Sequence, residues 1–139
     1  MAAHRKTYTD KSGERMTKIL VVDDEAPIRD MLKKYLIRKG YEVFDADNGI
    51  SALQIVRDQK PSIVLLDIRM PKGDDGVEVL RKIKEADKNI GVIMITAVSD
   101  SAIADKCMEL GAFDYITKPI SLEYLEECLL AKLLDYAFE

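Results

Sequence analysis

Acidic residues follow two of the most apolar segments of this 139-residue chain. Asp23 and Asp24 come directly after Ile19–Val22, and Asp67 comes directly after Ile63–Leu66. Three carboxylates brought together repel one another, and the pKa of at least one rises unless a cation shares the space. Oxygen ligands without Cys or His favour magnesium, with manganese as an alternative. A carboxylate can also attack phosphorus and form an acyl phosphate.

Two further groups suited to phosphoryl chemistry follow later apolar segments. Thr96 stands at the end of the run 91–95, and Lys118 follows the run 113–116 after one residue. A hydroxyl donor and a lysine cation would stabilise the oxygens of a phosphoryl group during transfer. Each residue alone has an ordinary explanation as a helix cap, a strand end or a surface lysine. Their shared position after apolar runs favours a functional site.

The elements that must position these residues alternate between short apolar runs and amphipathic stretches. We expect strands at 18–22, 41–45, 62–66, 91–95 and 113–116, and helices at about 27–39, 49–58, 76–86, 100–110 and 121–137. The first, third and fourth runs are almost wholly aliphatic, which is typical of strands buried on both faces. Five β-α units in series predict one doubly wound α/β domain with a parallel sheet. Ligands of such sheets bind beyond the carboxyl ends of the strands, where these polar residues fall.

Composition and charge argue against several classes of protein. The chain is 47% hydrophobic and 33% charged, as expected for a globular domain. Its apolar runs are too short for a membrane span and its N-terminus lacks a signal peptide, so we expect a cytoplasmic protein without membrane association. Residues 1–15 carry a net charge of +2 and the remainder −6, which does not favour nucleic-acid binding. Cys107 and Cys128 have no metal-binding spacing and are expected to be reduced thiols.

Four segments together resemble the receiver domains of two-component response regulators. They are Ile19–Glu25, Leu65–Pro71, Ile95–Ala97 and Gly111–Pro119, in the order and with the spacing of that family. The resemblance implies one flavodoxin-like domain over residues 17–139, with strand order 2-1-3-4-5 and five helices. Residues 1–16 would form a polar N-terminal extension.

The resemblance also implies roles for the acidic residues. Asp67 would be the phosphoacceptor. Asp23 and Asp24 would bind Mg²⁺ (or Mn²⁺) together with Asp67, with Asp24 the more direct ligand of the pair. The main-chain carbonyl of Arg69 would complete the protein ligands.

Residues near the later strands receive roles from the same resemblance. Thr96 would be the switch hydroxyl, Lys118 the lysine that contacts the phosphoryl group, and Tyr115 the switch aromatic. The peptide bond between Lys118 and Pro119 would be cis.

The implied function is a signalling switch and not a turnover enzyme, since the chain would catalyse only its own phosphorylation and dephosphorylation. A sensor histidine kinase or phosphorelay protein would donate the phosphoryl group. The surface of the fourth helix, fifth strand and fifth helix would then change to regulate a partner or output domain, or to form a homodimer. An alternative is a receiver fragment of a larger DNA-binding or enzymatic regulator. An aspartate-nucleophile phosphatase is disfavoured, because that class needs Asp-x-Asp where this chain has Asp-Asp-Glu.

Three features depart from the family pattern. Four residues, and not the usual three, separate Pro71 from Gly76. Arg69 could cover the phosphoryl group, and Val98 offers no polar group to orient water, which predicts slow autodephosphorylation; alternatively, Arg69 simply points to solvent. The last helix carries more apolar residues than one face can bury, which predicts a dimer or partner surface: Leu125, Leu129, Leu130, Leu133, Leu134, Tyr136 and Phe138.

Overall fold

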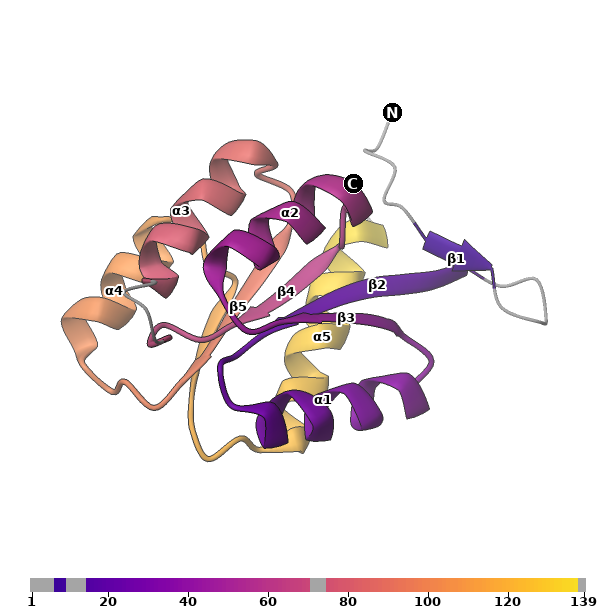
Figure 1. The fold of residues 1–139 in the computed structure, drawn as a ribbon, viewed down its shortest axis with the longest axis horizontal. Helices are drawn as coiled ribbons and strands as arrows, with labels where there is room; N and C mark the ends of the chain where they lie inside the picture. Colours follow the sequence, from indigo (N-terminus) through magenta and orange to yellow (C-terminus); the bar gives the residue numbers. More distant parts are fainter. Residues whose placement is uncertain (1–6, 10–14, 71–74, 138–139) are drawn as a thin grey trace.

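A computed structural model provides the structure of the chain and describes residues 7–9, 15–70 and 75–137. Five parallel strands form its central sheet: β2 (Arg15–Val22), β3 (Glu42–Ala46), β4 (Ile63–Leu66), β5 (Gly91–Thr96) and β6 (Asp114–Thr117). They lie in the order β3-β2-β4-β5-β6 (Figure 1). Counted among the parallel strands alone, this is the expected 2-1-3-4-5 order.

Among the residues that the structure describes, five helices cover the two faces of the sheet (Figure 1). The helices are α1 (Ala26–Arg38), α2 (Gly49–Gln59), α3 (Gly76–Ala86), α4 (Ser101–Glu109) and α5 (Leu122–Ala137). Side chains of α1 and α5 share one buried cluster, and those of α2, α3 and α4 share the other. The expected doubly wound architecture is therefore confirmed.

The strands β2, β4 and β5 supply apolar side chains to both clusters. Leu20, Val64 and Val92 face α2, α3 and α4, whereas their neighbours Ile19 and Ile63 face α1 and α5. Successive side chains of a strand point to opposite faces, so a strand covered on both sides needs apolar residues at every position. This requirement explains the uninterrupted aliphatic runs in the sequence.

Local capping determines where the outer helices begin and end. The side chains of Asn48, Asp75 and Asp100 each accept a hydrogen bond from a backbone N–H in the first turn of α2, α3 and α4. Gly40 and Gly111 follow α1 and α4 with φ of +95° and +103°, a conformation that side chains disfavour. The helix bounds consequently lie within a residue or two of those expected.

The structure differs from expectation at the N-terminus and on α1. β2 begins at Arg15, three residues earlier than predicted, and the added strand β1 (Thr7–Thr9) pairs antiparallel with it. A strand that projects beyond its neighbours leaves backbone groups unpaired, and the returning chain satisfies them. On α1, apolar residues recur at the spacing of one helical face, which predicts that Met31 is buried together with Leu32 and Leu36. Leu32 and Leu36 are buried, but Met31 is exposed.

No helix in the described ranges is both long enough and apolar enough to cross a membrane.

The carboxylate of Asp114 joins β6 to α5. It accepts hydrogen bonds from the hydroxyl of Tyr124 at 2.5 Å, the thiol of Cys128 at 3.1 Å and the backbone N–H of Tyr115 at 2.7 Å. Burial alone would raise the pKa of Asp114, but these bonds outweigh burial and lower it. Burial and the same carboxylate raise the pKa of Cys128 to about 12, so its free thiol stays protonated.

Asp114→Asn is expected to lower the free energy of unfolding by about 1–2 kcal/mol at neutral pH, because a charged acceptor of three hydrogen bonds is lost. A depressed folded-state pKa stabilises the fold above the ordinary carboxyl pKa of 3.8, and this stabilisation is lost as pH falls through the folded-state value. Urea unfolding across pH 2.5–7 should therefore show the two proteins converging in acid. The control Asp58→Asn changes an exposed carboxylate, and a pH-independent difference for Asp114→Asn would contradict the assignment.

Candidate functional site

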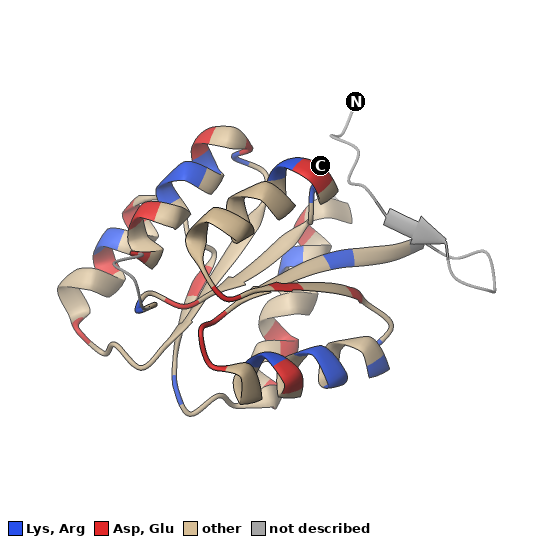
Figure 2. Cartoon of the chain, viewed as in Figure 1, with Lys and Arg blue, Asp and Glu red and all other residues tan. Residues whose placement is uncertain are grey.

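Residues from distant parts of the sequence meet at the carboxyl edge of the sheet. β2 and β4 are parallel neighbours with Val22 opposite Leu66, so the residues that follow them, Asp23 and Asp67, also lie side by side. The backbone N–H of Asp67 donates to the carbonyl of Val22 at 3.0 Å. Figure 2 shows acidic residues at this edge, where β2 and β4 end. Strand topology alone thus places residues 44 positions apart in contact.

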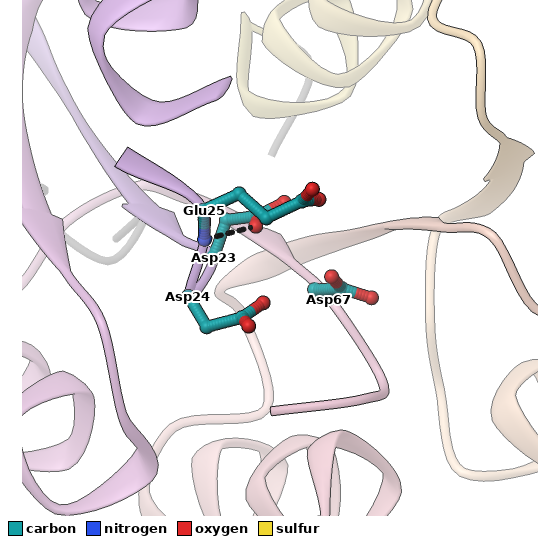
Figure 3. Close-up of side chains that lie close together, drawn as sticks. All are labelled: Asp23, Asp24, Glu25 and Asp67. Atoms are coloured by element: carbon teal, nitrogen blue, oxygen red, sulfur yellow. Dashed lines mark hydrogen bonds between the residues drawn. The ribbon is translucent and has the colours of Figure 1, made fainter. Parts of the chain in front are cut away.

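Four carboxylates form one cluster at this edge. Asp23, Asp24, Glu25 and Asp67 each offer an oxygen within 4.8 Å of the others (Figure 3). Asp23 and Asp67 are buried, Asp24 is half-buried and Glu25 is exposed. Burial is the main reason why the pKa of Asp23 is raised, and the nearby charge of Asp67 adds to it. An all-oxygen cluster of this kind can hold a hard divalent cation.

The side chain of Lys118 reaches into the cluster from the end of β6. Its Nζ lies 2.7 Å from Oδ2 of Asp23, 3.1 Å from Oδ2 of Asp67 and 3.1 Å from Oε2 of Glu25. Burial alone would lower the pKa of Lys118, but these hydrogen bonds raise it above its ordinary value. The ammonium group is therefore charged, and it offsets part of the negative charge beside Asp67.

A second pair of charged groups braces the end of β2. Nη1 of Arg29 donates to the main-chain carbonyl of Asp23 at 2.8 Å, and its Nε donates to Asp45 at 3.0 Å. Lys33 binds the other oxygen of Asp45 at 3.1 Å. This brace was not predicted from the sequence. The i, i+4 spacing of Arg29 and Lys33 predicts that both side chains lie on the same face of α1. This spacing does not show which carboxylate the two side chains bind.

The first turn of α3 packs directly on the main chain of Asp67. A Cβ added to Gly76 would lie 2.1 Å from the carbonyl oxygen of Asp67, so only glycine permits this approach. The backbone N–H of Gly76 donates to the carbonyl of Ile68 at 2.7 Å. The backbones of Arg69 and Asp75 form an isolated antiparallel β-bridge. Lys72, Gly73 and Asp74 of the four-residue spacing before Gly76 lie outside the described residues.

Arg69 contacts Asp67 through its main chain. Its backbone N–H donates to Oδ1 of Asp67 at 3.3 Å, and its side chain is exposed. The predicted contribution of the Arg69 carbonyl to a metal site stays a prediction.

Thr96 and Tyr115 are linked through the backbone of Val98. The buried hydroxyl of Thr96 accepts a hydrogen bond from the Val98 N–H at 3.2 Å, and the Tyr115 hydroxyl donates to the Val98 carbonyl at 2.5 Å. The backbone N–H of Lys118 donates to the carbonyl of Thr96 at 2.8 Å, and the peptide bond from Lys118 to Pro119 is cis. The structure thus brings Asp23, Asp24, Asp67 and Lys118 together and connects Thr96 to Tyr115.

Comparisons with known proteins agree with this architecture. The model of the family described as "response regulator receiver domain" matches residues 19–130. Sporulation initiation phosphotransferase F of Bacillus subtilis is 39% identical over 112 residues, which cover 81% of this chain and 90% of that protein.

Solved structures show the same similarity. A CheY-like receiver domain protein from Methanospirillum hungatei superimposes with a TM-score of 0.84 at 30% identity, covering 88% of this chain and 97% of the other. NtrX from Brucella abortus gives a TM-score of 0.77 at 32% identity, covering 88% of this chain but 29% of NtrX. The chain belongs to the response regulator receiver domain family. It is therefore a phosphorylation-activated switch domain of two-component signalling.

Gly76→Ala is expected to lower the free energy of unfolding by about 1–3 kcal/mol, because the new methyl group overlaps the backbone beside Asp67. The matched control is Gly91→Ala, whose Cβ would meet carbons of the flexible Lys132 side chain at 2.7 Å. Lys132 can move, so the control should lose less stability in a urea titration. Equal stability of Gly76→Ala and wild type would show that α3 does not pack this closely on Asp67.

Proposed function

We propose that Asp67 accepts a phosphoryl group from the phosphohistidine of a sensor kinase or phosphotransfer protein. The observation that carries this proposal is the position of Lys118, whose ammonium group contacts both Asp67 and Asp23. Glu25, a member of the same cluster of carboxylates, is exposed, so the cluster lies at the surface of the molecule. A buried carboxylate with a cation beside it and solvent nearby is suited to attack on an anionic phosphate.

In the proposed transfer, an oxygen of Asp67 attacks phosphorus while the bond from phosphorus to the histidine nitrogen breaks. The electron pair leaves with the imidazole, and Asp67 becomes an acyl phosphate. Lys118 donates hydrogen bonds to the phosphoryl oxygens. The backbone N–H of Arg69, already bonded to Asp67, keeps the acceptor oriented.

The acidic cluster would hold Mg²⁺, or Mn²⁺, through Asp23, Asp24 and Asp67, with the Arg69 carbonyl as a further ligand. The donor set fits such an ion, because it consists of oxygen atoms only and includes two buried carboxylates whose charges repel. When bound, the ion would neutralise charge on the phosphoryl oxygens as they approach the carboxylates.

The signal would pass to the surface through Val98. A phosphoryl oxygen on Asp67 would attract the Thr96 hydroxyl, which now accepts a hydrogen bond from Val98. The Val98 carbonyl holds the hydroxyl of Tyr115, so a shift of this loop changes the position of Tyr115. The surface of α4, β6 and α5 would then favour a different partner or output domain.

The last helix supports a partner surface or a homodimer. Leu125 and Leu129 are buried, but Leu130 and Leu134 are 52% and 59% exposed, which matches the predicted apolar surplus. Phe138 lies outside the described residues. A protein–protein surface is the ordinary use of such exposed apolar residues.

The same switch could serve as an independent protein or as part of a larger regulator. Phosphotransferase F is nearly matched in length, whereas NtrX is a much longer protein. We therefore propose a function for the receiver domain alone and place it in the cytoplasm. The domain would catalyse only its own phosphorylation and dephosphorylation and would turn over no separate substrate. We propose no direct contact of this chain with nucleic acid or membrane.

Incubation with acetyl phosphate and Mg²⁺ is expected to add one phosphoryl group to wild type and none to Asp67→Asn. Intact-mass spectrometry measures the adduct, and its loss in hydroxylamine identifies an acyl phosphate. Asp105→Asn, which changes an exposed carboxylate on α4, should behave as wild type. An adduct on Asp67→Asn would exclude Asp67 as the acceptor.

The phosphorylated form is expected to persist for minutes or longer, because Val98 is buried and apolar and Arg69 can cover the phosphoryl group. Arg69→Ala should shorten this lifetime by admitting water, whereas Lys106→Ala, an exposed change on α4, should not. Mass spectrometry after removal of acetyl phosphate measures both. Loss within seconds from wild type would refute the idea.

A further inference from the structure

Glu25 is the exposed member of the three carboxylates that bind Lys118. Its Oε2 lies 3.1 Å from Nζ, and its side chain is 57% exposed, compared with 4% for Asp23 and 6% for Asp67. Glu25 stands at the N-cap of α1, yet within the described structure its side chain makes no capping hydrogen bond. Its carboxylate extends over Asp23 on the same side as the other acidic groups (Figure 3). The backbone carbonyl of Glu25 accepts the first hydrogen bonds of α1, whereas its side chain binds Lys118 and does not cap the helix.

The hydrogen-bonding capacity of Lys118 is already used by these three partners. A lysine ammonium has three N–H donors, and its Nζ contacts three carboxylates. A phosphoryl group on Asp67 needs at least one of these donors, so one carboxylate must give way. Breaking a buried ion pair leaves an uncompensated charge, whereas an exposed carboxylate is readily hydrated. Glu25 is thus the partner that costs least to displace.

We propose that Glu25 is a competing counter-ion that holds Lys118 in the unphosphorylated protein and is displaced when a phosphoryl group forms on Asp67. This inference rests on the proposed phosphorylation of Asp67. Glu25 is then a positioning residue that weakens binding of anionic phosphoryl groups and slows phosphorylation by small anionic donors. It repels an incoming anion directly and also withholds the cation that would bind it.

The same carboxylate has the opposite effect on a divalent cation. Glu25 lies within 4.8 Å of the other acidic oxygens, so its charge attracts Mg²⁺. Without it, Lys118 would also interact more with Asp23 and Asp67, which further disfavours the metal. Removal of this one charge should therefore weaken cation binding and strengthen anion binding. A residue needed only for folding would not separate the two affinities in this way.

The test is isothermal titration calorimetry of Glu25→Gln with Mg²⁺ alone and then with beryllofluoride, a phosphoryl mimic, at saturating Mg²⁺. The Mg²⁺ dissociation constant should rise about two- to threefold and that of beryllofluoride should fall about three- to tenfold, from one unit of charge acting through a water-like medium. Both differences should shrink at 0.5 M salt, where the Debye length is only about 4 Å. Phosphorylation by acetyl phosphate should be faster by a similar factor.

The controls distinguish a failure of the proposed role of Glu25 from a failure of the proposed phosphorylation of Asp67. Asp30→Asn removes the same charge from the exposed face of α1, outside the ion pairs of Lys118, and should match wild type. Glu25→Ala should reproduce Glu25→Gln. If wild type binds beryllofluoride and both Glu25 variants bind it equally or more weakly, the competing role is overturned while phosphorylation stands. If wild type, like Asp67→Asn, binds no beryllofluoride, the proposed function fails, and the role of Glu25 fails with it.

Discussion

The ion pairs of Lys118 with Asp23 and Asp67 are the interaction on which the functional edge depends. Two buried carboxylates at the ends of neighbouring strands repel, and burial in a medium less polar than water strengthens that repulsion. A single ammonium group between them offsets the charge and leaves both carboxylates near an accessible edge. A divalent cation at this edge would offset the same negative charge, and an anionic phosphoryl group on Asp67 would compete for the same ammonium donors.

This charge balance is connected to the rest of the fold by the backbone. The backbone N–H of Lys118 donates to the carbonyl of Thr96. The hydroxyl of Thr96 accepts a hydrogen bond from the backbone N–H of Val98, and the carbonyl of Val98 accepts one from the hydroxyl of Tyr115. The opposite side is held by Arg29, which binds the main chain of Asp23. These hydrogen bonds connect the ends of the strands to the backbone of Val98 and to α1. A change of charge at Asp67 has a physical route to the surface of α4 and β6.

The alternation of apolar runs and amphipathic stretches allowed the parallel α/β fold to be predicted, and resemblance supplied the strand order. The convergence of the carboxylates and Lys118 was also predicted, because each follows a strand that must end at the same edge. Contacts that depend on side-chain direction were not. Glu25 stands at the N-cap of α1 but its side chain binds Lys118, and Arg29 of α1 binds the main chain of Asp23. The antiparallel strand β1 was missed, since three polar residues carry little pattern.

Taken alone, the sequence determined which faces are buried and which residue types stand at the strand ends. Hydrophobic period and turn chemistry act over a few residues, and they can be read without knowing the fold. Only the tertiary structure decided that three carboxylates bind the same lysine, Lys118. It also decided that Gly76 packs against the main chain of Asp67 and that the backbone of Val98 connects Thr96 to Tyr115. These contacts join residues on separate elements, so they depend on how strands and helices pack, which local pattern does not encode.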